Sequence, residues 1–313
     1  MDNRITKKRL SDFLSYDWII MIVAAVAVII LWELIYSIVA TRLSVGQQFK
    51  YYIDEDFYSY NMSSIYDVLG VNSGENGKTF SYDVLSVDAE SLNKEYNVLS
   101  VRLSVQEGDA IFTSSVINEE DQTSRVKTVI DGNSVYDFNS LLNSAKDYLS
   151  QFKDGDAISE AKIRAYFDER MQGDKRFKTD DQKEEGRINE IGRIVKLASD
   201  VKDFEKLLKS GNQNLFYKYV KYEQASNGDE NDGTYGAVYQ KEKAKGELVY
   251  GLNMGALSGG KQNVSDYLKL KESDSAENVV LLLFDFSSYQ YDLQFESISF
   301  TITLVKEFSN ILG

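Results

Sequence analysis

The sequence predicts an α/β protein in which a single N-terminal transmembrane helix is followed by an extracytoplasmic domain of two lobes. Three observations predict this class. An apolar run of 23 residues with one charge lies at residues 18–40, near the start of the chain. Short strand-like apolar runs then alternate with helical patterns, which is typical of an α/β domain. Residues 136–244 are mostly helical in pattern, and this indicates a second, helix-rich lobe.

The composition excludes several kinds of chemistry. The 313 residues include no cysteine and no histidine, which excludes disulfides, thiol catalysis, a lipid anchor on cysteine and histidine-based catalysis or metal binding. The first 42 residues hold 5 of the 35 basic and 4 of the 49 acidic side chains, so the remainder holds 30 basic and 45 acidic side chains, a net charge of −15. A domain this acidic argues against nucleic acid or anionic lipid as a partner. We expect neither a metal site nor a cofactor.

Residues 18–40 fit an uncleaved membrane anchor, so the lipid bilayer is a predicted partner of the chain. At a rise of about 1.5 Å per residue, the run is long enough to cross a hydrocarbon core of roughly 30 Å. Trp18 lies at one end, with Trp32 and Tyr36 toward the other, as interfacial aromatic residues do. A cleaved signal peptide would have a shorter apolar region and small residues at its cleavage site, but Ile38 occupies one of those positions.

The charges beside the span predict its orientation. Four basic residues precede it, and acidic residues soon follow it, so the positive-inside rule places residues 1–17 in the cytoplasm and the large domain outside the plasma membrane. Glu33 is the charged residue within the span. It either stays hydrated near the outer interface beside Trp32 or pairs with a basic group on a partner membrane helix.

The α/β lobe is expected to comprise residues 44–135 and 245–313. Strands are predicted at residues 44–54, 80–89, 110–115, 246–254 and 279–286, with a short helix at 57–69. Two segments stay open. Residues 96–105 alternate like a strand, although Leu99 and Leu103 also suit a helix. Residues 293–312 likewise suit either a strand or a helix.

The helix-rich lobe is expected to comprise residues 136–244. Apolar residues on one face predict a helix at 136–152, and the charged residues 156–210 are helical in pattern. A buried stripe is predicted within the second stretch, at Ile191, Ile194, Val195, Leu197 and Ala198. Residues 226–236, "SNGDENDGTYG", predict a polar loop rich in oxygen ligands. The spacing of a calcium-binding EF-hand fails there, because the sixth position holds Asp232 in place of glycine.

The stretch "ALSGGKQNV" at residues 256–264 is similar to nucleotide-binding loops, but its context excludes that function. Gln262 stands where a P-loop needs serine or threonine for the metal ion, and no complete P-loop lies upstream. An exported domain would also meet little ATP. The stretch instead predicts a glycine-rich turn, followed by a short helix and the buried strand at 279–286.

Residues 47–152 show a strand–helix–strand pattern that includes "VQEGDAIFTS", where Gly108 and Asp109 stand at a turn that leads into a buried strand. In this pattern the segment resembles the type II extracellular solute-binding proteins of ABC importers. The "PD" pair of the family is absent, because Ala110 and Ile111 follow Asp109. The family is also usually secreted or anchored by a lipid on cysteine, whereas this chain has a predicted membrane helix.

The resemblance implies a ligand between two lobes, at the carboxyl ends of strands and near Asp54, Thr113 and Ser114. The alternative is that these three residues are ordinary solvated loop ends. We expect a bacterial binding or accessory protein that captures or senses a small solute, or assists a membrane transporter or another membrane protein. The alternatives are a structural cell-envelope protein and an envelope hydrolase that uses two carboxylates. Among 45 acidic residues, the sequence singles out no such pair.

Overall fold

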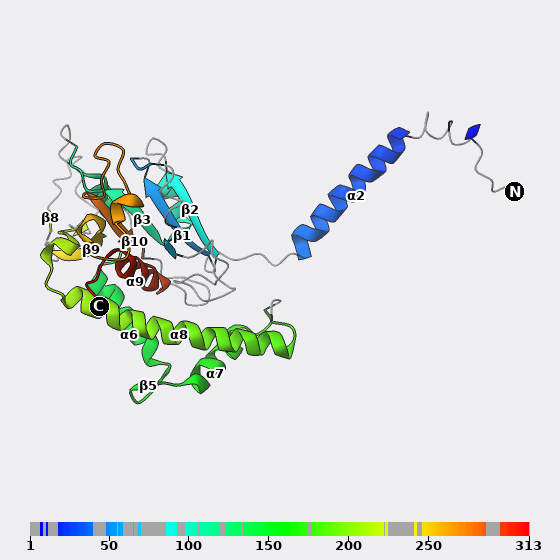
Figure 1. Cartoon of the computed structure of the whole chain (residues 1–313). Helices are drawn as coiled ribbons and strands as arrows, with labels where there is room; N and C mark the ends of the chain where they lie inside the picture. Colours follow the sequence, from blue (N-terminus) through cyan, green and yellow to red (C-terminus); the bar gives the residue numbers. More distant parts are fainter. Residues whose placement is uncertain are drawn as a thin grey trace, which may run out of the picture. The chain divides into compact units, whose positions relative to one another are not determined.

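The protein is described from a computed structural model of the whole chain (Figure 1). The described residues are 7–8, 11, 18–39, 48–54, 56–58, 65, 68–69, 86–92, 98–105, 107–118, 123–132, 134–174, 177–221, 223–224, 241–242, 246–285 and 295–312. The chain divides into two compact units, Met1–Arg42 and Leu43–Gly313.

The first unit contains the apolar helix α2, which spans Trp18–Val39. Among the described residues, α2 is the one helix that is long and apolar enough to cross a membrane, with a mean hydropathy of 2.7 over Trp18–Tyr36. All four predicted anchor residues lie on it with exposed side chains: Trp18, Trp32, Glu33 and Tyr36. A helix that is apolar on every side needs apolar surroundings, so α2 is a candidate membrane span.

The second unit is built around a mixed six-stranded sheet, which confirms the α/β class. The strands stand in the order β2 (Ser86–Leu92), β1 (Gln48–Asp54), β3 (Ala110–Ser114), β10 (Val279–Leu283), β9 (Leu248–Asn253) and β6 (Phe216–Tyr219). β2, β1 and β3 run parallel, whereas β10, β9 and β6 each pair antiparallel with their neighbours. The strands predicted at 246–254 and 279–286 are therefore confirmed as β9 and β10.

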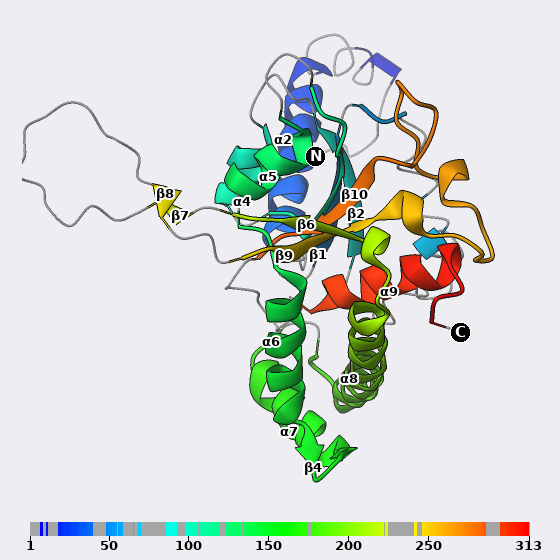
Figure 2. The same ribbon diagram turned by 90° about the vertical axis from the view of Figure 1, so that its left-hand side faces the viewer.

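Both faces of the sheet are covered, because its strands carry apolar side chains on both sides. Tyr52 and Ile111 point to the face that α4 (Val98–Ser104) and α5 (Arg125–Gly132) cover. Tyr51 and Phe112 point to the opposite face. That face is covered by α6 (Phe138–Ser150), α8 (Asp180–Lys209) and α9 (Glu296–Phe308). Figure 2 shows the two groups of helices on either side of the strands.

Helix α9 forms the middle of the larger core. Every one of its residues except Lys306 is buried. The ring of Phe300 lies 4.8 Å from that of Phe49 and 5.6 Å from that of Tyr51, while α8 covers the other side of α9. The open choice at residues 293–312 is therefore settled as a helix over 296–308. A helix that is buried all round has no polar face, so its sequence lacks the pattern of an amphipathic helix.

The structure does not show the expected division into two lobes. α6 and α8, which belong to the expected helix-rich lobe, share one hydrophobic core with β1, β3, β10 and α9. Leu43–Gly313 accordingly form a single compact unit. The helices were expected to stand apart because they follow one another in the chain, but their apolar faces are buried against the sheet and α9 instead.

Two helices of the helix-rich segment, α6 and α8, have capped N-termini. Asp137 accepts hydrogen bonds from the backbone N–H groups of Asn139 and Ser140 at the start of α6. At the start of α8, Thr179 and Gln182 form a reciprocal capping box. The remaining described elements are α7 (Glu160–Arg170), β4 (Lys153–Asp154), β5 (Ala157–Ile158), β7 (Glu223–Gln224), β8 (Lys241–Glu242), η4 (Gln213–Leu215), η5 (Met254–Ala256) and η6 (Val264–Asp266).

Several local predictions need correction or completion. The ambiguous residues 96–105 form helix α4, because Leu99 and Leu103 are buried on one helical face. Phe57 lies in a β-bridge to Leu270, whereas a helix was expected to begin there. Val195 was predicted to be buried in α8 but is 49% exposed, because it lies on the face turned away from α9. The predicted loop at 226–236 falls outside the described residues.

Candidate functional site

The topology of the sheet creates a crevice between the carboxyl ends of β1 and β3. The chain passes from β1 to β2 on one side of β1, then returns to β3 on its other side. The helical residues after β1, at positions 65, 68 and 69, lie on one face of the sheet, whereas α4 and α5 lie on the other. The connections that leave β1 and β3 therefore diverge. In open α/β sheets, ligands bind at such a switch point.

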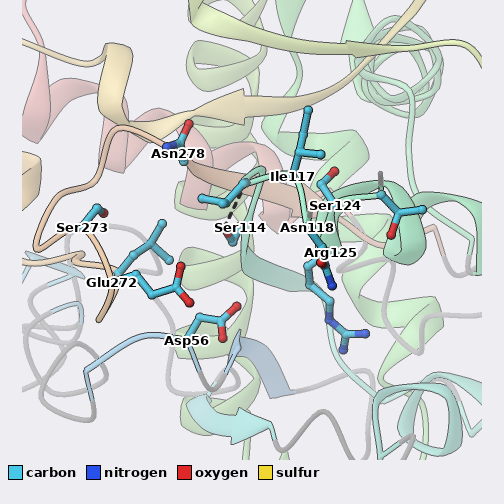
Figure 3. Close-up of a pocket in the computed structure, with 12 residues that line it drawn as sticks. Asp56, Ser114, Ile117, Asn118, Ser124, Arg125, Glu272, Ser273 and Asn278 are labelled. Carbon is cyan, nitrogen blue, oxygen red and sulfur yellow. Dashed lines mark hydrogen bonds between the residues drawn. The ribbon is translucent and has the colours of Figure 1, made fainter. Parts of the chain in front are cut away.

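A cavity of about 870 Å³ opens at this switch point. Its volume lies in the usual range for small-molecule sites, roughly 300–1,000 Å³. Most of the residues that line it are of polar type (Figure 3): Asp56, Ser114, Val116, Ile117, Asn118, Thr123, Ser124, Arg125, Leu270, Glu272, Ser273 and Asn278.

Two backbone junctions hold the walls of the cavity. On one side, the backbone N–H of Lys271 donates to Asp56 O at 2.7 Å, which joins the segment after β1 to the segment before β10. On the other side, Asn118 N–H donates to Thr123 O at 2.7 Å, and this bond places Ser124 and Arg125 beside the end of β3. Ser115 N–H also donates to Asn278 O at 2.9 Å. The polar groups therefore stand on a backbone that is fixed at both walls.

The charges at the cavity are divided between its two walls. Arg125 is the first residue of α5, and its Nε donates to Asp54 Oδ1 at 3.4 Å. Asp54 is fully buried, while the Arg125 side chain keeps 22% of its surface exposed. Figure 3 shows the carboxylates of Asp56 and Glu272 on the opposite side from the Arg125 guanidinium. A ligand with acceptors at one end and donors at the other would match this division.

The structure brings the three predicted site residues to the same edge of the sheet, but only Ser114 lines the cavity. Its hydroxyl is nearly buried and accepts a hydrogen bond from Val116 N–H at 3.2 Å. Asp54 lies beneath the cavity and acts on it through Arg125. Thr113 is fully buried at the β10 pairing, and its side chain is not part of the lining.

Most of the lining residues, including Arg125, Asp56 and Glu272, were not predicted from the sequence. A basic residue at the start of the helix that follows a buried strand is the signal that could have singled out Arg125, because that position opens on the carboxyl edge. No comparable signal exists for Glu272. It reaches the cavity through the bridge between Phe57 and Leu270, residues far apart in sequence.

The nucleotide-like stretch at 256–264 has a structural role at α9. The backbone of Gly260 lies so close to the end of α9 that a Cβ atom there would meet Phe308 C at 2.2 Å. Gly259 forms a β-bridge with Ser309, and Lys261 Nζ lies 3.2 Å from Glu307 Oε1. Gly260 therefore allows the two backbones to approach closely, and Gly259 has a positive φ of 76° that favours glycine. The lysine pairs with a carboxylate of the chain itself.

No group of three or more acidic side chains among the described residues is arranged to hold a metal ion. No family model, curated protein or solved structure matches the chain.

Proposed function

We propose that this protein is a membrane-anchored binding protein that takes a small polar solute into the cavity between β1 and β3. The observation that carries the proposal is the position of the cavity. It lies where the chain topology leaves a crevice, and it is lined by hydroxyl, amide, guanidinium and carboxylate groups from four separate segments. The buried strands β1 and β3, which end at the cavity, support these groups.

The division of charge suggests the chemistry of the solute. Arg125, with the neighbouring hydroxyls of Ser114 and Ser124, favours a carboxylate or another acceptor group. Asp56 and Glu272 favour an ammonium group or several hydroxyls. Amino acids, short peptides and polyhydroxylated acids fit both requirements. The resemblance to solute-binding proteins likewise implies a small solute as the ligand, without indicating its class.

We propose that α2 anchors the chain in a plasma membrane, with residues 1–17 in the cytoplasm and the domain of Leu43–Gly313 outside. The basic residues before the span and the acidic domain after it support this orientation. In this position the domain could pass its solute, or report it, to a membrane transporter. Glu33 would then be the residue with which α2 recognises a basic group on another membrane helix.

Thermal unfolding of the full chain in detergent, with panels of amino acids, peptides, sugars and sugar acids, tests the proposal. A solute that binds the folded state alone, at about 100 times its dissociation constant, stabilises it by roughly 2.7 kcal/mol. We expect at least one amino or hydroxy acid to raise the midpoint. If none of these compounds raises it, the binding proposal fails.

Substitutions locate the bound solute. Arg125→Gln should raise the dissociation constant of the solute about tenfold or more, because a charged hydrogen bond is lost. Calorimetry measures this constant. Arg164→Gln is the matched control, since Arg164 pairs with Glu184 outside the cavity. Unfolding without solute shows whether the loss of the Asp54 contact destabilises the Arg125 variant. Equal affinities for the two variants would place the solute elsewhere.

A further inference from the structure

We propose that two copies of this chain associate through α8, in antiparallel orientation, along a stripe of exposed residues. The stripe is defined by seven residues: Asp181, Glu185, Ile188, Gly192, Val195, Ser199 and Lys202. The proposal does not depend on the cavity.

The stripe has the geometry of a helix–helix seam. Its members follow one another at alternating steps of four and three residues, which keeps them on one face of a helix. All seven are exposed, and the stripe runs for about 31 Å at 1.5 Å per residue. The opposite face of α8, with Ile194, Leu197 and Val201, is buried in the core of the domain. Figure 2 shows that α6, α7 and α8 extend together from beneath the sheet.

The middle of the stripe is apolar although it faces water. Ile188 is 56% exposed and Val195 is 49% exposed. Between them lies Gly192, and nothing comes within 4 Å of the position that its Cβ atom would take. Glycine in an exposed helix interior lowers helix stability, and its presence here allows the backbone of a second helix to approach closely.

The charges at the two ends identify a second copy as the partner. The N-terminal end of the stripe carries Asp181 and Glu185, and the C-terminal end carries Lys202. A two-fold axis through Gly192 would place Asp181 within one residue of the position opposite Lys202 of the second copy, and Ile188 within one residue of the position opposite its Val195. A parallel pair would instead place Asp181 against Asp181 and Lys202 against Lys202, which repel each other. The same stripe is therefore complementary to itself only in the antiparallel orientation.

One helical stripe is small beside the roughly 1,200–2,000 Å² that stable complexes bury. We therefore expect weak association in dilute detergent. Anchoring both copies in one membrane raises their effective concentration and favours the pair. The decisive experiment uses the full chain in membrane vesicles.

Cysteine crosslinking tests the pairing directly, because the chain has no cysteine of its own. Gly192→Cys should form covalent dimers on mild oxidation, since the two thiols would meet at the two-fold axis. Neither Glu185→Cys nor Ser199→Cys should crosslink alone, but the double variant should, because each cysteine would face the other in the second copy. Glu169→Cys, exposed on α7, measures random collisions.

Charge and apolar substitutions give a second test in the Gly192→Cys background. Val195→Asp should reduce the crosslinking rate about tenfold or more by placing carboxylates in the seam. Lys202→Glu should reduce it as well, and adding Asp181→Lys should restore it. Because all these positions are exposed, each variant should keep its fold, and circular dichroism checks that it does.

Three outcomes would overturn the proposal. The first is that Gly192→Cys forms no more dimers than the Glu169→Cys background. The second is efficient crosslinking of Glu185→Cys alone, which would indicate a parallel pair, and the third is crosslinking of Gly192→Cys to a different protein in place of a second copy.

Discussion

Arg193 carries a positive charge into the core of the domain and joins three helices there. Its side chain is 1% exposed. From α8 it donates to Glu190 at 2.6 Å, to Glu296 of α9 at 3.0 Å and to the Tyr148 hydroxyl of α6 at 2.9 Å. Burial by itself would lower the pKa of Arg193, but Glu190, Tyr148 and Glu296 together hold it well above its usual range. The guanidinium therefore stays charged and fully paired.

Removal of this side chain should destabilise the domain strongly. Arg193→Ala leaves Glu190 and Glu296 buried without their partner, a change that typically costs about 3–5 kcal/mol. Arg187→Ala on the same helix is the matched control, because Arg187 pairs with Asp168 and Glu184 at the surface and should matter much less. Urea unfolding of the full chain in detergent, followed by circular dichroism, measures both. Equal losses would mean that the buried charge has no special role.

At the scale of elements, α6 and α8 are also joined at the surface. Glu205 of α8 lies 2.8 Å from Lys146 of α6 and 2.6 Å from Lys209. Hydrogen bonds from Lys146 and then Lys209 lower the pKa of Glu205 from 4.5 to about 2. Because the pKa of Glu205 is lower in the folded chain than in the unfolded chain, its two ion pairs stabilise the fold at pH values above 4.5. Their effect is lost as pH falls from 4.5 toward about 2.

Glu205→Gln should therefore lower stability at neutral pH, and the difference from the unchanged chain should shrink as pH falls through this window. Glu169→Gln, at an exposed position of α7, serves as the control and should follow the unchanged chain at every pH. Denaturant midpoints measured between pH 7 and pH 2 check the prediction. A constant difference between Glu205→Gln and the unchanged chain would show that the ion pairs contribute nothing.

The elements that the sequence predicted well are those with one buried face or a short buried run. α6 shows its apolar stripe, and β10 is a continuous apolar segment between turns. α9 could not be assigned, because burial on all sides removes the periodicity that distinguishes a helix. Only a small part of the candidate site could be predicted. Ser114 follows from its place at the end of a strand, whereas Glu272 depends on a bridge formed only in the folded chain.

At the scale of the whole molecule, the proposed orientation makes a direct prediction. The chain has no native cysteine, so a single introduced thiol reports its own side of the membrane. In intact bacterial cells, a membrane-impermeant maleimide should label Ser150→Cys, and it should label Lys8→Cys only after lysis. Both positions have exposed side chains. The reverse pattern would place the domain in the cytoplasm, and labelling of both in intact cells would argue against a span at α2.

The order of the chain also determines when the domain can fold. β10 stands between β3 and β9 in the sheet, and α9 fills the space between the sheet and α8. Both are made after all the other described elements, as residues 279–308. A growing chain that lacks them has a sheet in two halves, and its α8 can pack against α6 and α7 but lacks its contacts with α9. If the domain is exported while it is being made, its folding can be completed only after these late residues have emerged on the far side of the membrane.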